Sequence, residues 1–166
     1  VDIIGVDAYY PLASKNNPTL AELKAAWKPK VAALASLGAK WQKPIILTEI
    51  GYRSLDGAAM HPWDWQVTGK VDLREQADCY QAAFGSSYNE PWLAGIYWWS
   101  WSPDPFEGGP DDSGYSPHDK PAEDVLRTWF GGKPRNGRRV EPEPDPTRSM
   151  EIISDGLGQG WQDWSW

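Results

Sequence analysis

The chain has 166 residues, 40% of them hydrophobic, and this is enough apolar material for a core. Its formal net charge of −7 argues against nucleic acid or an anionic membrane surface as a partner, and its single cysteine excludes an internal disulfide or a thiolate metal cluster. Twelve tryptophans and seven tyrosines are an excess that favours carbohydrate recognition, because flat aromatic faces stack on sugar rings. No apolar run approaches the ~18 residues of a transmembrane helix.

The first strand–helix unit begins with an apolar run over residues 1–7, which predicts a buried strand ending in Asp7. Thr19 and Glu22 have the spacing of a capping box and predict the start of a helix. Pro29 is expected to kink or split this helix, because proline removes a backbone donor and clashes with the preceding turn. Gly38 is expected to end it.

The second unit begins with the apolar run of residues 45–49, which predicts a strand ending in Glu49. Gly51 is expected to let the chain turn away. A long loop with two tryptophans follows, to residue 71. Asp72 is then expected to cap a helix, with Glu75 as its reciprocal partner in a capping box.

The third unit has a predicted strand over residues 92–99, a loop rich in proline, glycine and aspartate, and a last helix that starts at Pro121 and stops at Gly131. Its inward-facing residues are expected to be Val125, Leu126, Trp129 and Phe130. Strands alternating with helices imply an α/β fold with a parallel sheet. Three strands cannot close a (β/α)8 barrel, which needs about 250 residues, so residues 1–131 are expected to be its last three units, with five units upstream.

Beyond residue 131 the composition changes. Residues 132–148 combine a basic cluster with an acidic, proline-rich run, which predicts an extended linker. Residues 149–166 contain two runs with strand character and are interpreted as the start of a truncated all-β domain.

Glu49 has the position that chemistry requires in such a fold. Catalytic residues of α/β barrels lie at the C-terminal ends of the strands, and barrel glycosidases place carboxylates there, so Glu49 is a candidate nucleophile. Arg53 or Tyr52 is expected to keep Glu49 ionised, by charge or by hydrogen bonding. Asp7 is expected to orient a substrate hydroxyl or Arg53, with a purely structural hydrogen bond as the alternative.

Four motifs together carry a family resemblance. They are Asp7-Ala-Tyr-Tyr-Pro11, Thr48-Glu-Ile-Gly-Tyr-Arg-Ser54, Gly95-Ile-Tyr-Trp-Trp-Ser-Trp101 and Lys120-Pro-Ala-Glu123. In this order they resemble the C-terminal part of glycoside hydrolase family 113, the β-mannanase-like barrels of clan A, over residues 1 to about 131. Residues 149–166 resemble the opening of a β-sandwich module appended to secreted glycosidases.

The resemblance implies a retaining, endo-acting hydrolase of β-1,4-mannan in which Glu49 is the nucleophile, from strand 7 of the barrel. The acid/base of the family is a glutamate at the end of strand 4, upstream of residue 1. Tyr9 or Tyr10 matches the aromatic position of strand 6, near the nucleophile. Trp99 matches the strand-8 position that floors the subsite for the sugar to be cleaved, with Trp101 beside it. The expected substrate-binding residues are Asp7, Tyr9, Tyr10, Tyr52, Arg53, Trp99 and Trp101.

The other acids of the chain are weaker candidates for catalysis than Glu49. Glu90 precedes the third strand, so it is expected about 20 Å from Glu49, at the opposite end of the sheet and outside the catalytic site. The acids and the histidine between residues 111 and 119 match no metal motif and are interpreted as a solvated loop, so no metal and no cofactor are expected.

The sequence therefore predicts a secreted, monomeric glycosidase whose partner is a polysaccharide or oligosaccharide, and this chain alone is expected to be inactive. A carbohydrate-binding barrel that has lost catalysis is the alternative function. A free-standing three-layer α/β module is disfavoured, because the strand at Val1 would leave an open sheet edge.

Overall fold

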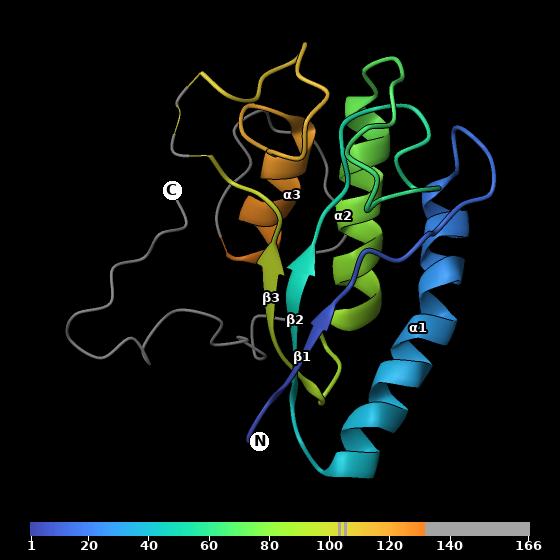
Figure 1. Cartoon of the computed structure of the whole chain (residues 1–166), viewed down its shortest axis with the longest axis vertical. Helices are drawn as coiled ribbons and strands as arrows, with labels where there is room; N and C mark the ends of the chain where they lie inside the picture. The colour runs from blue at the N-terminus through green and yellow to red at the C-terminus, as the bar shows by residue number, and fades with distance from the viewer. Residues whose placement is uncertain (103, 105, 132–166) are drawn as a thin grey trace.

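The computed structural model of the chain describes residues 1–102, 104 and 106–131, so the expected linker (132–148) and β-domain (149–166) lie outside the described residues. Three strands alternate with three helices (Figure 1). The elements in chain order are β1 (Ile4–Asp7), α1 (Leu20–Trp41), β2 (Ile45–Ile50), α2 (Leu73–Ser87), β3 (Leu93–Trp98) and α3 (Pro121–Trp129).

The three strands form one parallel sheet in the order β1-β2-β3, which confirms the predicted α/β architecture. All three arrowheads point to the same edge of the sheet in Figure 1. A register shift after Val6 pairs Asp7 with Glu49, so the two acids at the ends of β1 and β2 are direct neighbours. The C-terminal edge of the sheet therefore collects side chains from all three units.

The helices cover one face of the sheet (Figure 1), as expected for right-handed crossovers between adjacent parallel strands. On the central strand Ile45, Leu47 and Ile50 are fully buried, whereas Thr48 is exposed. On β3, Tyr97 leaves 54% of its surface exposed. The core thus lies between the sheet and the helices, and among the described residues the other face of the sheet carries exposed side chains.

The helix α1 begins as the sequence predicts. The Oγ1 atom of Thr19 accepts a hydrogen bond from the backbone N–H of Glu22, and the Glu22 carboxylate accepts one from the N–H of Thr19 at 2.7 Å. Lys15, 2.7 Å from that carboxylate, is the main cause of the lowering of the Glu22 pKa to about 2, and the Thr19 hydrogen bonds add to it.

Pro29 does not split this helix, and the expectation that Gly38 ends it was wrong. A single helix runs through both residues to Trp41, and Gln42, with a left-handed φ of 49°, ends it. One lost backbone hydrogen bond at Pro29 is tolerated because the helix packs a long apolar face on the core. Gly38 has a different role, because a Cβ there would lie 3.2 Å from the carbonyl oxygen of Lys43.

The helix α2 is capped by Asp72, whose carboxylate accepts a hydrogen bond from the N–H of Glu75 at 2.9 Å, as predicted. The reciprocal half of the capping box was wrong. Glu75 is buried and turns instead toward the preceding loop, where its carboxylate accepts hydrogen bonds from the N–H groups of Gly57 (3.0 Å) and Ala59 (2.8 Å).

The helix α3 has Pro121 in its first turn and Gly131, at a φ of 82°, just past its end, as predicted. Val125, Leu126 and Trp129 are buried as predicted, whereas Phe130 is 48% exposed and packs one edge contact on the buried Phe84, with centroids 5.5 Å apart. In the described part of the chain, none of the helices combines the length and the apolar character that crossing a membrane requires.

Candidate active site

The backbone around Glu49 is fixed from both sides. Beyond the end of β1, the N–H of Ala8 donates to the carbonyl oxygen of Glu49 at 2.6 Å. Beyond the end of β3, the N–H of Trp99 donates to the carbonyl oxygen of Ile50 at 2.7 Å. The ladder therefore continues past the strand ends and holds the Glu49 main chain between its two neighbours.

Tyr9 is the aromatic residue at the Glu49 side chain. Its hydroxyl donates to Oε2 of Glu49 at 3.1 Å. Burial raises the pKa of the Tyr9 phenol, and the hydrogen bond and negative charge of Glu49 raise it further. The phenol is thus held in its protonated form, in which it can donate to the carboxylate.

Tyr10, the other candidate for this position, points elsewhere. Its ring packs edge-on against Trp27 of α1 at 5.5 Å, and the ammonium group of Lys30 lies 5.3 Å from its centroid. Burial raises the pKa of its hydroxyl. Of the two adjacent tyrosines, the structure brings Tyr9 to Glu49 and packs Tyr10 on the helix.

Asp7 makes the structural contact that was one of its two expected roles. The hydroxyl of Thr48 donates to its Oδ1 at 2.7 Å, across the β1–β2 pair. Asp7 is exposed. The alternative, in which Asp7 orients Arg53, was wrong, because the guanidinium of Arg53 is bonded to loop oxygens.

Arg53 joins two loops. Its Nη1 donates to the carbonyl oxygens of Trp65 (2.9 Å) and Val67 (2.5 Å), and its Nε donates to the carbonyl oxygen of Ser113 (3.1 Å). The side chain thus ties the β2–α2 loop (residues 51–72) to the β3–α3 loop (residues 99–120). Its described hydrogen bonds go to these loop oxygens and to the Ser113 hydroxyl rather than to Glu49.

The hydroxyl of Tyr52 also has a partner other than Glu49. Its side chain is completely buried, and its hydroxyl donates to the carbonyl oxygen of Tyr10 at 3.4 Å. The hydroxyl of Tyr52 is therefore not the hydrogen-bond donor to Glu49 that was one of its expected roles. Its surroundings are those of a core residue rather than of a residue that meets substrate.

Three tryptophans at and just beyond the end of β3 have different environments. Trp98 stacks on Tyr80 of α2, with centroids 3.8 Å apart, and belongs to the packing between sheet and helix. Trp99 is 48% exposed beside Glu49's strand. Trp101 is partly buried, and its ring meets the edge of His118 at 5.5 Å. Trp99 is thus the tryptophan with an open surface at the sheet edge.

Gly51 makes room for the Trp99 backbone. A Cβ at Gly51 would overlap the carbonyl oxygen of Trp99 and would lie 3.2 Å from Cδ1 of Tyr115. The strand β2 ends at Ile50, directly before Gly51, and the φ of Gly51 is outside the left-handed region. The residue is needed because two chain segments pass close to its Cα.

Tyr115 and Lys120 are site-region residues that sequence reasoning missed. Tyr115 places its ring edge-on against Tyr9 at 6.4 Å and donates a hydrogen bond from its hydroxyl to the carbonyl oxygen of Pro62 at 2.7 Å.

Lys120 is buried and forms an ion pair with Asp112 at 2.6 Å. Burial lowers the pKa of Lys120, and Asp112 opposes that change. Asp112 is therefore a structural partner, and the interpretation of this loop as merely solvated was wrong for it.

Glu90 lies before β3, at the end of the parallel sheet opposite to that of Glu49. Its carboxylate accepts a hydrogen bond from the indole N–H of Trp92 at 3.1 Å. This contact gives Glu90 a structural role.

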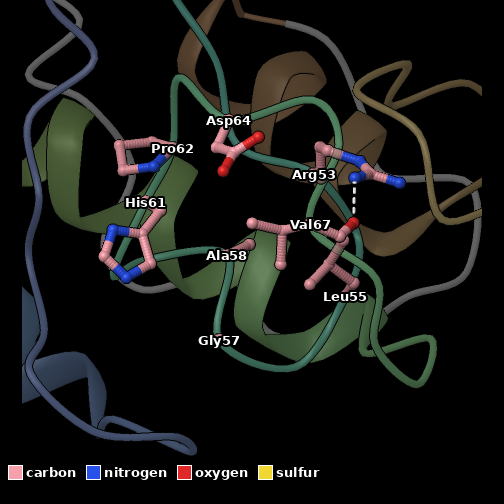
Figure 2. A pocket seen from close by; sticks show the side chains of 8 residues that line it. All are labelled: Arg53, Leu55, Gly57, Ala58, His61, Pro62, Asp64 and Val67. Atoms are coloured by element: carbon pink, nitrogen blue, oxygen red, sulfur yellow. Dashed lines mark hydrogen bonds between the residues drawn. The ribbon is translucent and has the colours of Figure 1, made fainter.

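The carboxylates of Asp56, Asp72 and Glu75 approach one another within 4.8 Å, but they already accept hydrogen bonds from protein groups. A nearby hollow, shown in Figure 2 beside the Arg53–Val67 hydrogen bond, has a volume of about 10 Å³. This is room for about one water molecule and excludes a sugar ring. The open surface beside Trp99 is the better candidate for a sugar.

The described residues have adjacent parallel strands, helices on one face of the sheet, and an acid at the C-terminal strand edge. These features are typical of α/β-barrel proteins. The chain belongs to Glycoside Hydrolase Family 113, whose model matches residues 1–120.

Solved structures of this family are similar to the chain. A GH113 β-1,4-mannanase complex has 26% identity and a TM-score of 0.62, over 76% of this chain and 38% of that one. The GH113 β-mannanase of Alicyclobacillus acidocaldarius, in complex with ManMIm, has 33% identity and a TM-score of 0.62, over 76% and 37%. The chain thus spans less than two-fifths of their length. A search of curated proteins found no match.

Proposed function

We propose that the chain forms part of a retaining, endo-acting glycoside hydrolase of β-1,4-linked mannan, in which Glu49 is the nucleophile. The observation that carries this proposal is the hydrogen bond from Tyr9 to Oε2 of Glu49 at the C-terminal edge of the sheet, in a chain of Glycoside Hydrolase Family 113. The similar solved structures described as β-1,4-mannanases support the choice of mannan.

In this mechanism Glu49 attacks the anomeric carbon while a general acid protonates the departing glycosidic oxygen. The bond from Glu49 to the sugar gives a glycosyl-enzyme, which water then hydrolyses with the same acid/base residue accepting the proton. Tyr9 holds Oε2, and among the described residues no donor reaches Oε1, which is therefore the oxygen proposed to attack. Trp99 offers a flat, half-exposed surface for the sugar ring.

The acid/base carboxyl has to lie about 5–5.5 Å from the nucleophile. Asp7 is the neighbouring acid, but Thr48 occupies its Oδ1, and we propose instead a glutamate of another barrel strand. The chain spans 37–38% of the solved structures, which is close to three eighths and supports an interpretation as three of the eight barrel units. The proposed protein is secreted, monomeric and cofactor-free.

The proposal is tested by Glu49→Gln in the intact protein, on a soluble β-1,4-linked manno-oligosaccharide. Loss of the attacking anion with retention of shape is expected to lower turnover by several orders of magnitude. A 2-deoxy-2-fluoro mannoside is expected to label the peptide that contains Glu49, as detected by mass spectrometry. Glu90→Gln is the matched control, because its amide oxygen can still accept from Trp92.

A Glu49→Gln protein that turns over normally, or a label on another peptide, would refute the assignment. A wild-type protein that binds manno-oligosaccharides without cleaving them would support the non-catalytic carbohydrate-binding alternative instead.

A further inference from the structure

We propose that Tyr115 is a positioning residue that couples the β2–α2 loop to the Tyr9–Glu49 pair. Its ring is inferred to hold Tyr9 in place for turnover, and its hydroxyl to hold the part of the loop that presents Trp63 to the substrate chain. This inference rests on the proposed function, because it assigns a role toward the same nucleophile.

The ring of Tyr115 is partly buried at the site. It meets Tyr9 edge-on, with centroids 6.4 Å apart and planes at 78°. Its Cδ1 lies so close to Gly51 that a Cβ there would be only 3.2 Å away. Gly51 follows Glu49 by two residues, so the Tyr115 ring touches both the donor to Glu49 and the main chain that carries Glu49.

The hydroxyl of Tyr115 reaches the β2–α2 loop. It donates to the carbonyl oxygen of Pro62 at 2.7 Å. Burial raises the pKa of this phenol, against the effect of Arg53, so the hydroxyl remains a donor. Pro62 directly precedes Trp63, which is 53% exposed. Trp65, two residues further on, is 71% exposed.

Arg53 holds a different part of the same loop. Its bonds go to the carbonyl oxygens of Trp65 and Val67, whereas the Tyr115 bond goes to Pro62, upstream of Trp63. Residues 61–64 form a turn around Trp63. The N–H of Asp64 donates to the carbonyl oxygen of His61, so this hydrogen bond lies within the turn. Among the described hydrogen bonds, the one from the Tyr115 hydroxyl joins this turn to the site, and the buried Pro62 side chain adds packing.

Tyr115 itself is fixed by the core. Its carbonyl oxygen accepts a hydrogen bond at 3.0 Å from Nε2 of Gln76, a fully buried residue of α2. The preceding residue, Gly114, accepts from the N–H of Ser54 (3.1 Å) and from the Lys120 ammonium (3.2 Å). A side chain with so rigid a base can transmit position to both of its contacts.

The two contacts can be separated by substitution. Tyr115→Phe retains the ring and removes the bond to Pro62, so KM for long manno-oligosaccharides is expected to rise about 2- to 10-fold, the size of one neutral hydrogen bond, with kcat unchanged. Tyr115→Leu also removes the aromatic contact with Tyr9 and is expected to lower kcat about 2- to 10-fold as well. The restoration of kcat by phenylalanine at this position distinguishes positioning by the ring from a general loss of structure.

The experiment uses the intact protein with short and long manno-oligosaccharides, and measures kcat, KM and amide hydrogen exchange of residues 56–67. Faster exchange of these amides in Tyr115→Phe is expected. Trp63→Ala is expected to give the same KM effect, and the double variant is expected to be no worse than either single one, because both changes remove one contact with substrate. Tyr80→Phe is the matched control, because the buried Tyr80 hydroxyl has no hydrogen-bond partner among the described residues.

Unchanged loop exchange and unchanged KM in Tyr115→Phe, or an unchanged kcat in folded Tyr115→Leu, would overturn the inference. If Tyr115→Leu does not fold, Tyr115→Phe still decides it through KM and exchange. An inactive Glu49→Gln together with normal Tyr115 variants refutes the coupling alone, whereas a fully active Glu49→Gln refutes the proposed function and this inference with it.

Discussion

The hydroxyl of Tyr9 lies 3.1 Å from Oε2 of Glu49, and 40 residues of sequence separate the two. The contact forms because β1 and β2 pair in parallel with Asp7 opposite Glu49, so the residues that follow β1 pass over the end of β2. One strand–helix unit thus presents the carboxylate and the preceding unit supplies its hydrogen-bond donor.

Tyr9→Phe removes this donor and keeps the ring. A hydrogen bond to a charged group contributes about 1.5–3 kcal/mol. We expect this bond to stabilise the transition state by a similar amount, so its loss is expected to lower kcat by about 10- to 100-fold. Steady-state kinetics on a manno-oligosaccharide measures it. Tyr10→Phe is the control, because Tyr10 packs on Trp27, and it is expected to keep normal turnover. Equal losses in both variants would show that the hydroxyl of Tyr9 has no particular role.

Much of this geometry could be predicted from the sequence. The apolar runs place Asp7 and Glu49 at strand ends, and the Thr19 capping box fixes the start of α1, because these signals lie within a few residues of one another. The choice between Tyr9 and Tyr10 could not be made in this way. It depends on how the loop after β1 turns relative to α1.

The contacts between the loops could not be predicted from the sequence. Arg53 finds its oxygen partners up to 60 residues away, and Tyr115 meets Pro62 across 53. Each donor has many equivalent acceptors in a sequence, and only the path of the folded loops selects one. Glu75 is a further example. Its spacing from Asp72 predicts a capping box, but in the folded chain its carboxylate accepts hydrogen bonds from the preceding loop.

Glu75→Gln tests that loop contact. A carboxylate accepts from both Gly57 and Ala59, whereas an amide has a single acceptor oxygen, so the substitution is expected to destabilise the protein by about 1–3 kcal/mol. Urea unfolding measures the difference. Glu22→Gln, on the exposed N-terminus of α1, is the control and is expected to cost less, since solvent can replace its contacts.

The effect of Glu75→Gln has a predicted pH dependence. Burial raises the pKa of Glu75 above the ordinary value of 4.5, although the two backbone N–H groups oppose this change. A raised carboxyl pKa stabilises the folded state below the unfolded pKa, and this contribution is lost as pH rises through the folded pKa. The stability difference between wild type and Glu75→Gln is therefore expected to shrink between pH 4 and pH 7, and a difference that grows over this range would contradict the assignment.

Gly51→Ala tests the close approach at the strand end. The added methyl group would overlap the carbonyl oxygen of Trp99, so the backbone has to shift, at a cost of about 1–3 kcal/mol. Because Gly51 follows Glu49 so closely, turnover per folded molecule is expected to fall too. Thermal unfolding and kinetics check both effects. Gly85→Ala, in exposed helix beside the flexible end of Lys24, is expected to be neutral or slightly stabilising.

Trp99→Ala and Trp92→Ala separate recognition from packing within one strand and its flanks. Trp99 is 48% exposed beyond the C-terminal end of β3, where a sugar ring can stack on it. Trp92 is 8% exposed at the other end, and its indole N–H is bonded to Glu90. The two substitutions remove the same atoms from opposite ends of the strand. Their effects are expected to differ in kind.

Trp99→Ala is expected to lower activity per folded molecule by orders of magnitude and to leave the free energy of unfolding almost unchanged. Trp92→Ala is expected to destabilise the protein by about 3–5 kcal/mol, as is typical of a buried tryptophan, while the molecules that remain folded turn over normally. Urea unfolding gives the stabilities, and kinetics at a temperature where both variants are folded gives the activities. If Trp99→Ala mainly unfolds the protein and its folded fraction is fully active, Trp99 is a packing residue and the proposed sugar platform is wrong.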